Sequence, residues 1–221
     1  MTDSPRLSGV VLALDVDGVV LEAPNDPREH WLKQFTRRFG VEADELRTTF
    51  FKQWWPEIIV GRQPIEVGLA EVFSSLGWNI DVEDALACWF DGDFFVDNDV
   101  VSAAKEWSSR GARVVLATDQ ERRRVSYLER HLSPLLPFCG IAYSGQLGHQ
   151  KVEAAFYPAA ENFLGVSQRE VVVFVDDRVV NVTVAQQHGW LGWHFEKGDD
   201  WRRGIESLLL RASRRDPTAP E

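Results

Sequence analysis

The 221-residue sequence has few of the features that mark secreted, membrane-spanning or disulfide-rich proteins. Its two cysteines, Cys88 and Cys139, are too few for a disulfide framework and show no metal-binding spacing, so we expect both to be buried as small apolar side chains. No apolar run approaches the roughly 20 residues that cross a membrane, and the first residues lack the basic start and apolar stretch of a secretory signal. We therefore expect a cytoplasmic protein with no membrane partner.

Positive charge is also scarce, with 24 Lys and Arg against 34 Asp and Glu and a formal net charge of −10. Nucleic acids are bound through clustered basic side chains, so this balance argues against a nucleic-acid partner. We interpret the basic cluster at 121–124 as the solvated face of a helix and the one at 211–215 as part of a frayed tail. The last six residues, 216–221, are expected to be disordered.

Five short runs rich in β-branched and apolar residues predict buried parallel strands. These runs are 10–14, 112–117, 138–144, 171–175 and 190–195. Helix-like patterns follow or separate them at 97–110, 121–132, 151–164, 178–188 and 200–211. The alternation predicts an α/β protein with a doubly wound parallel sheet and right-handed crossovers.

Residues 22–96 interrupt this alternation, because they contain no clear strand. They hold four helix-like patterns, at 28–39, 43–55, 64–76 and 82–91, and many aromatic residues. We expect a small helical domain inserted after the first strand, with the catalytic core made of residues 1–21 and 97–221. Most of its aromatic side chains should form its own core. Trp54, Trp55 and Arg62 are candidates to face a substrate instead.

Polar side chains follow each of the strands expected near the centre of the sheet. They are Asp15 and Asp17 after the first, Thr118 and Asp119 after the second, Lys151 after the third, and Asp176 and Asp177 after the fourth. Ligands of open parallel sheets bind beyond these carboxyl ends. The carboxylates of Asp15, Asp17, Asp176 and Asp177 gathered there would repel one another unless a cation compensates, and oxygen ligands without His or Cys suit Mg²⁺. Lys151 and the Thr118 hydroxyl would complete a site for a phosphoryl group.

These residues resemble the four ordered motifs of the haloacid dehalogenase superfamily. The matching segments are DVDGV (15–19), Thr118 after an apolar strand, Lys151, and VDDRVVN (175–181). The resemblance spans nearly the whole chain, and the helical insert is similar to the family's C1-type cap. It implies a Rossmann-like core with sheet order 5-4-1-2-3 and a phosphatase-like activity.

The resemblance also implies a chemical role for each matched residue. Asp15 corresponds to the nucleophile that forms an aspartyl-phosphate, and Asp17 to the general acid and base. Thr118 and Lys151 correspond to the residues that bind the transferred phosphoryl group. Gly18 would let the chain pass close to the phosphate.

For the metal, the resemblance implies Mg²⁺ held by the Asp15 carboxylate, the Asp17 backbone carbonyl and the Asp176 carboxylate. Asp177 would position a metal-bound water. As an alternative compatible with this role, Asp176 and Asp177 could cap the helix predicted at 178–188.

Several positions near the motifs depart from the usual pattern or allow a purely structural role. Asp119 stands where Asn is common, and we weigh a role as the N-cap of the helix at 121–132 equally with a place in the site. Lys151 lacks the proline that often follows it, and a solvated lysine at a helix start is the alternative. Asn181 is expected to brace its loop rather than bind metal, and Arg178 to form a structural ion pair rather than contact substrate.

Together these observations predict Mg²⁺-dependent hydrolysis of a small phosphate monoester. Asp17 separates the sequence from the superfamily's dehalogenases, which lack an acid two residues after the nucleophile. A phosphomutase or phosphotransferase on the same core, and a non-catalytic binding or regulatory protein, are the alternatives. The sequence determines neither the ester nor the oligomeric state.

Overall fold

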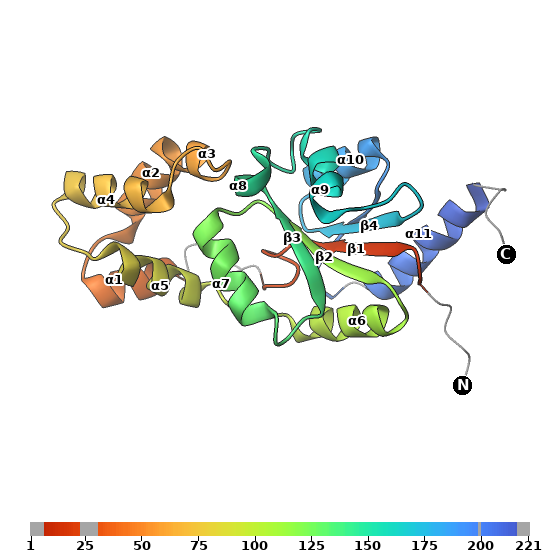
Figure 1. Cartoon of the computed structure of the whole chain (residues 1–221). Coiled ribbons are helices and arrows are strands. Elements are labelled where there is room, and N and C mark those ends of the chain that lie inside the picture. The colour runs from red at the N-terminus through yellow and green to blue at the C-terminus, as the bar shows by residue number, and fades with distance from the viewer. Residues whose placement is uncertain (1–6, 23–30, 199, 216–221) are drawn as a thin grey trace.

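The computed structural model describes residues 7–22, 31–198 and 200–215, with side chains described as far as residue 209. Its centre is a five-stranded parallel sheet (Figure 1). The strands are β1 (Val10–Leu14), β2 (Arg113–Thr118), β3 (Phe138–Tyr143), β4 (Val171–Asp176) and β5 (Leu191–His194). Their order, β3-β2-β1-β4-β5, is the predicted order read from the other edge. The predicted sheet is therefore confirmed, with β1 at its centre.

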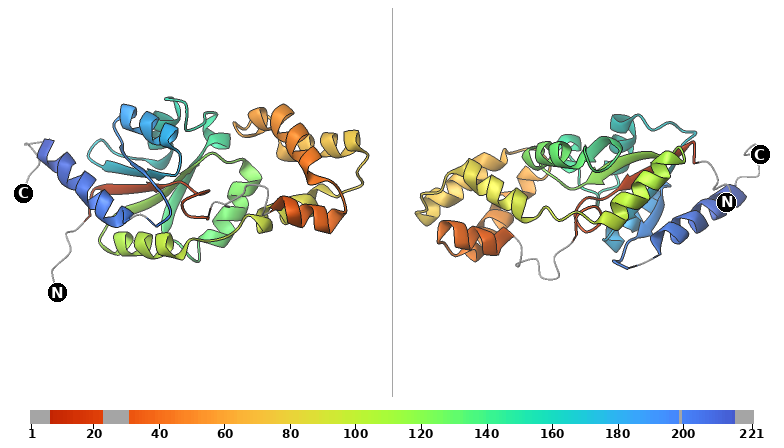
Figure 2. Two further views of the ribbon diagram at one scale, coloured as in Figure 1. Left: turned by 180° about the vertical axis from the view of Figure 1, so that it is seen from behind. Right: turned by 90° about the horizontal axis from the view of Figure 1, so that it is seen from below.

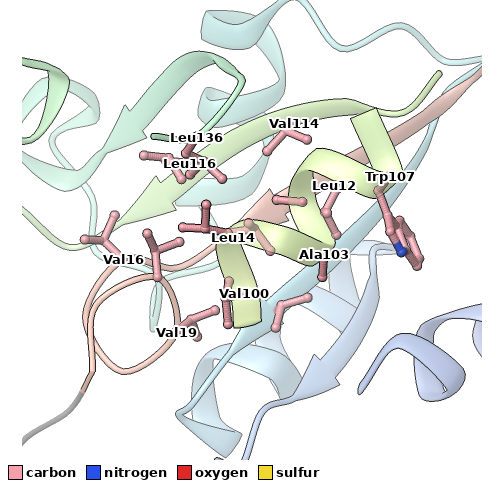
Figure 3. Close-up of a cluster of buried hydrophobic side chains, with 14 of the residues drawn as sticks. Leu12, Leu14, Val16, Val19, Val100, Ala103, Trp107, Val114, Leu116 and Leu136 are labelled. Atoms are coloured by element: carbon pink, nitrogen blue, oxygen red, sulfur yellow. The ribbon is translucent and has the colours of Figure 1, made fainter. Parts of the chain in front are cut away.

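Alternate side chains of β1 point to opposite faces of the sheet, and they are apolar on both faces. Helices therefore cover both faces of the sheet. Leu12 and Leu14 belong to the cluster of apolar side chains drawn in Figure 3, whereas Val11 and Ala13 belong to a second cluster. The first cluster includes side chains of α6 (Asn98–Ser109), α7 (Arg122–Leu132) and α11 (Trp201–Arg215). The second includes side chains of α9 (Phe156–Leu164) and α10 (Val179–His188).

Five helices between β1 and β2 form a third hydrophobic cluster of their own. They are α1 (Trp31–Phe39), α2 (Ala43–Gln53), α3 (Trp55–Ile58), α4 (Ile65–Leu76) and α5 (Val82–Gly92). We call residues 31–92 the helical insert. It lies at the end of the sheet where the strands finish, and α7 lies beside it (Figures 1 and 2). Residues 28–30 of the first predicted helix lie outside the described residues, and the domain boundaries at 21 and 97 stay a prediction.

Local sequence signals set the ends of the insert helices. Helix α4 begins after Pro64 and ends at Gly77, whose φ of 69° is left-handed and favours glycine. Helix α5 begins after Asp81, whose carboxylate accepts a hydrogen bond from the Asp84 backbone N–H at 3.0 Å. The helix predicted at 43–55 is divided into α2 and α3, and Pro56 stands in the first turn of α3.

Two chain segments connect the insert to the core, and they run side by side. The Glu22 N–H donates to the Phe95 carbonyl at 2.7 Å, and the Asp97 N–H donates to the Val20 carbonyl at 2.9 Å. Between these bonds, Leu21 and Val96 form an antiparallel bridge. The insert is therefore joined to the core by a paired connection just beyond β1.

Some expectations are wrong or fall outside the described residues. The helix predicted at 151–164 begins only at Phe156, after a short helix α8 (Ser144–Leu147) and turns at 151–155. Cys139 is exposed, since the first three residues of the edge strand β3 are not buried; Cys88 is buried as expected. The tail at 216–221 and the side chains at 211–215 lie outside the described residues. Among the described helices, none is long and apolar enough to cross a membrane.

Candidate active site

Three polar residues end the central strands at one edge of the sheet. Asp15 directly follows β1, and its N–H donates to the Val175 carbonyl at 2.9 Å, which continues the ladder between β1 and β4. Thr118 is the last residue of β2 and Asp176 the last residue of β4. All three are almost fully buried. Parallel pairing thus brings together the residues that the sequence placed at this edge.

Lys151 lies between the two buried carboxylates. Its Nζ is 2.6 Å from Oδ1 of Asp15 and 2.7 Å from Oδ2 of Asp176, and its side chain is only 2% exposed. This contact excludes the alternative of a solvated lysine at a helix start. The backbone of Lys151 is fixed at both ends, because its N–H donates to Asp119 Oδ1 at 2.9 Å and its carbonyl oxygen lies 2.8 Å from the Tyr157 hydroxyl.

Asp119 is not the N-cap of α7. Glu121 has that place, and its carboxylate accepts hydrogen bonds from the N–H groups of Arg123, at 2.7 Å, and of Arg124. Asp119 instead holds the loop that carries Lys151. Burial raises the pKa of Asp119, and the nearby Lys151 opposes this rise. The unusual acid at this position is therefore part of the site's scaffold.

Asn181 braces Asp176, as expected for this position. Its Nδ2 donates to both carboxylate oxygens of Asp176 at 3.1 Å, and the Arg178 N–H donates to Oδ1 at 2.8 Å. The residue preceding α10 is Arg178, so neither Asp176 nor Asp177 is its N-cap. Arg178 itself is exposed, and its side chain forms no ion pair with the described residues, contrary to expectation.

The charges at this edge do not balance. Burial raises the pKa of Asp15 well above its ordinary value; Lys151 opposes the rise, and the charges of Asp176 and Asp17 add to it. Burial alone would lower the pKa of Lys151, but Asp15, Asp176 and Asp119 outweigh it and raise that pKa. One lysine therefore serves several carboxylates, which leaves negative charge for a further cation to neutralise.

Asp15, Asp176 and Asp177 together could hold a metal ion, since one carboxylate oxygen from each lies within 4.8 Å of the others. An all-oxygen set suits a hard divalent cation. The Asn181 amide oxygen is buried and has no hydrogen-bond donor among the described residues, a setting that suits a hydrated ion. The family resemblance implies that the Asp17 backbone carbonyl binds the metal and that Asp177 positions a metal-bound water, and both assignments stay predictions.

Gly18 makes room for Asp177. Its φ of +86° is left-handed, and a Cβ atom there would stand 2.3 Å from Asp177 Oδ2. The Gly18 N–H donates to the Leu21 carbonyl at 2.8 Å, which closes the tight turn after β1. A glycine is therefore required both by the backbone conformation and by the approach of the carboxylate.

Asp17 is exposed to solvent, unlike Asp15 and Asp176. Its Oδ2 accepts a hydrogen bond from Gln120 Nε2 at 2.5 Å. Gln120 is buried, and its carbonyl accepts from the Gly145 N–H at 3.0 Å. The sequence did not indicate Gln120, because its neutral amide forms no recognisable pattern until its contact with Asp17 is known.

A cavity of about 220 Å³ lies between the insert and the core, beside Asp17. We call it the insert–core cavity. Its apolar side consists of Trp31, Phe51, Trp55, Ile65, Trp89 and Phe90, all from the insert. Its polar side consists of Asp17, Asp93, Asp119, Gln120, Glu121 and Arg124. Of the three residues suggested to face substrate, Trp55 lines this cavity, Trp54 packs in the insert core, and Arg62 pairs with Glu57 at 3.3 Å in an exposed position.

The cluster at 121–124 is not a solvated face, because the insert lies against this part of α7. Arg123 forms ion pairs with Glu66 of α4 and Glu83 of α5, each with a closest distance of 2.5 Å. Arg124 is buried and donates to the Phe90 carbonyl at 2.7 Å. Both arginines therefore join the core to the insert.

No protein-family model and no curated protein matches the sequence. Solved structures do match it along most of its length. A haloacid dehalogenase (HAD) family enzyme from Bacteroides thetaiotaomicron aligns over 90% of this chain and 98% of its own, with a TM-score of 0.73 and 17% identity. The same enzyme in complex with magnesium and inorganic phosphate covers 89% of this chain and 98% of its own, with a TM-score of 0.71 and 16% identity.

Two further solved structures with different enzyme descriptions are also similar to this chain. A HAD-like family hydrolase from Porphyromonas gingivalis covers 90% of this chain and 97% of its own, with a TM-score of 0.67 and 20% identity. An L-2-haloacid dehalogenase from Xanthobacter autotrophicus covers 95% of this chain and 84% of its own, with a TM-score of 0.60 and 16% identity. The chain thus has the fold of HAD family enzymes, a fold that serves more than one reaction.

Proposed function

We propose that this chain, which has the HAD fold, is a Mg²⁺-dependent phosphatase that hydrolyses a small phosphate monoester in the cytoplasm through an aspartyl-phosphate. One observation carries the proposal: Lys151 Nζ bridges the buried carboxylates of Asp15 and Asp176, and Asp177 completes a carboxylate cluster beside them. Such a charged centre suits the several oxygens of a phosphoryl group. The magnesium and phosphate held by the similar Bacteroides enzyme support the same chemistry.

The residues of the site divide the reaction between them. Asp15 attacks phosphorus with a carboxylate oxygen, and the bond from phosphorus to the ester oxygen breaks. Asp17 gives its proton to the departing oxygen, which leaves as an alcohol. Asp17 then takes a proton from water as that water attacks phosphorus, so that inorganic phosphate leaves and the Asp15 carboxylate is restored.

The remaining groups bind and orient the phosphoryl group. Lys151 places positive charge beside its oxygens, and Thr118 offers a hydroxyl at the end of the neighbouring strand. Mg²⁺ held by the Asp15 and Asp176 carboxylates and the Asp17 backbone carbonyl, with Asp177 positioning a bound water, would neutralise the charge on those oxygens. Gln120 holds the Asp17 carboxylate on the side of the insert–core cavity, where the leaving alcohol would lie.

The test is phosphate release from a panel of alkyl, sugar and aryl phosphates, measured with Mg²⁺ and with a chelator. Asp15→Asn is compared with Asp84→Asn, a matched change at an exposed acid that pairs with Arg38 on the insert. We expect release only with Mg²⁺, its loss in Asp15→Asn, and wild-type release in Asp84→Asn. Release that persists with chelator or in Asp15→Asn contradicts the proposal.

The two alternatives predict different products. A phosphomutase or phosphotransferase consumes the ester but yields a second ester in place of free phosphate, which phosphorus NMR distinguishes. A binding or regulatory protein yields neither product, although it binds Mg²⁺. The observation that disfavours this last alternative is that every matched residue, from Asp15 to Asp176, is present and most of them are gathered at one edge of the sheet.

A further inference from the structure

The insert–core cavity is placed to receive the alcohol part of the substrate. It begins at Asp17, which in the proposed function protonates the oxygen of the leaving alcohol. Its volume of about 220 Å³ is below the roughly 300 Å³ at which pockets for drug-sized ligands begin. The alcohol that fits is therefore small. The chemistry inferred for this alcohol rests on the proposed function.

The insert supplies a wall of aromatic rings. Phe51, Trp55 and Trp89 line the cavity and are only partly buried, with ring centroids 5.2 to 5.7 Å apart. Trp31 stacks on Trp89 at 4.7 Å and so supports it on one side. The faces of such rings are electron-rich, and they attract positively charged groups, most strongly where water is excluded.

The polar side of the cavity is rich in negative charge. Among the described residues, four carboxylates line it, from Asp17, Asp93, Asp119 and Glu121, against a single basic side chain, Arg124. Burial raises the pKa of Asp93 to about 6; Arg124 opposes this rise, and the charge of Asp17 adds to it. Asp93 therefore lacks enough positive charge in its surroundings, whereas Asp119 and Glu121 accept backbone hydrogen bonds from the protein.

Arg124 does not supply that charge to a ligand, because its guanidinium is directed at the protein. It donates to the Phe90 carbonyl at 2.7 Å and to the Asp93 carbonyl at 3.4 Å. It also lies 5.2 Å from the ring centroids of both Phe90 and Tyr127. These contacts hold it at the carboxyl end of α5, where a cation is favourable.

We infer that the substrate is the phosphate monoester of a small alcohol that carries a positive charge, a quaternary or protonated amine. The cationic group would lie between the rings of Trp55 and Trp89 and the carboxylate of Asp93, while its phosphate lies at Asp15 and Lys151. A second anionic group on the alcohol would be repelled by the same carboxylates. A neutral group would gain only the apolar contact.

The sharpest test compares two esters of the same shape. In phosphocholine the alcohol ends in a trimethylammonium group, and in 3,3-dimethylbutyl phosphate a carbon replaces the nitrogen. Phosphoglycolate serves as an anionic comparator, and amine buffers are left out because they could compete. We expect kcat/KM for phosphocholine to exceed that for the neutral ester by about tenfold or more, with the anionic ester lowest.

A substitution at the aromatic wall should remove this preference. Trp55→Leu keeps an apolar side chain but removes the ring, so the ratio of the two kcat/KM values should fall toward one. The matched control is Trp78→Leu, because Trp78 packs against Phe73 in the insert and does not line the cavity. Retention of the ratio in Trp55→Leu, or its loss in both variants, overturns the assignment of the cation to this wall.

The outcomes separate this inference from the proposed function. If both esters are hydrolysed in a Mg²⁺-dependent manner and the neutral ester is equal or better, the phosphatase stands and the cationic site is wrong. If no phosphate ester is hydrolysed, the proposed function fails, and calorimetry of choline against 3,3-dimethylbutanol decides about the cavity. Tighter binding of choline supports a cationic site, and equal or absent binding overturns it.

Discussion

The charged edge of the sheet and the aromatic side of the insert are built by different interactions, although Asp17 and Asp119 beyond the strand ends line the same cavity as the aromatic rings. At the sheet edge, Lys151 and two carboxylates are buried together at distances of 2.6 and 2.7 Å, so each charge depends on the others. In the insert, rings such as Trp55 and Trp89 pack through apolar surface and tolerate changes of shape more readily.

This difference separates the reaction from the choice of substrate. The charged edge is fixed by the central strands and can support only chemistry that uses its carboxylates. The aromatic side comes from helices that reach the core through the pair Leu21 and Val96 and through Arg123 and Arg124. The side chains that line the cavity from the insert can therefore be substituted without moving the charged residues at the strand ends. Four substitutions test this separation. Two are at the charged edge of the sheet, one is on the aromatic side, and one is in the link between the insert and the core.

The largest effect is expected for Lys151→Met, which leaves buried carboxylates without their cation. Removing one partner of a buried ion pair costs about 3–5 kcal/mol of stability, and loss of a positive charge at the phosphoryl group lowers kcat by roughly 10²–10³-fold. Mg²⁺ should raise the melting temperature of the variant more than that of the wild type. Thermal unfolding with and without Mg²⁺ measures this, with Lys105→Met on the exposed face of α6 as control. Equal stability of the two variants would contradict the buried ion pair.

Asp17→Asn should affect chemistry but not stability. The asparagine keeps an oxygen that can accept from Gln120, and the side chain is exposed, so unfolding by denaturant should be unchanged. Loss of a general acid typically lowers kcat by about 10²–10⁴-fold. The loss should be greatest for alkyl esters, whose leaving oxygen needs the proton, and smaller for an aryl ester. A variant that keeps most of its activity on alkyl esters would remove Asp17 from this role.

The sequence predicted the sheet and its polar edge well, because periodicity and strand ends are local signals. It placed Asp15, Thr118 and Asp176 at one edge, where the structure has them. It did not predict how Lys151 is held. That depends on a hydrogen bond to Asp119, 32 residues away in the sequence, and on Tyr157 of the following helix.

The same limit explains the errors on α7. Its charged N-terminal sequence is typical of a solvated helix face. Only the position of the insert shows that Arg123 and Arg124 contact insert residues. Gln120 was missed for a related reason, since a neutral amide carries no signal until the acid opposite it is known. The sequence therefore predicted the helices and strands, but it did not predict the side-chain contacts between elements that are distant in the chain.

On the aromatic side, Asp93 should give the protein a pH-dependent stability. Its pKa is about 6 in the folded protein, against an ordinary value of 3.8, because burial disfavours the charged form. Between these values the folded state binds more protons than the unfolded state, so stability falls as pH rises from about 4 to 6 and stays lower above. Two units of pKa correspond to about 3 kcal/mol.

Asp93→Asn should lose the part of this fall in stability that Asp93 causes, which denaturant unfolding at pH 4.5 and 7.5 can measure. Asn also alters the hydrogen bond that Trp89 Nε1 donates to Asp93 at 3.2 Å, which changes stability at every pH. The informative quantity is therefore the difference in unfolding free energy between pH 4.5 and pH 7.5. Other buried carboxyls with raised pKa values, such as Asp15 and Asp119, act equally in both proteins. A fall of equal size in Asp93→Asn and the wild type would show that Asp93 is not the group responsible.

The smallest effect is expected for the link between the two regions, in Arg123→Gln. The pairs of Arg123 with Glu66 and Glu83 are partly exposed, and such pairs each contribute about 0.2–1 kcal/mol, so the stability change should be small. If these pairs hold the insert against α7, kcat/KM of the wild type should fall when salt approaches about 1 M, where the Debye length is about 3 Å. The variant should start lower and respond less to salt. Arg130→Gln, at an exposed position of the same helix, should behave as the wild type. The same salt response in all three proteins would contradict this role of the ion pairs. The insert would then be held against the core by its apolar contacts and its paired connection alone.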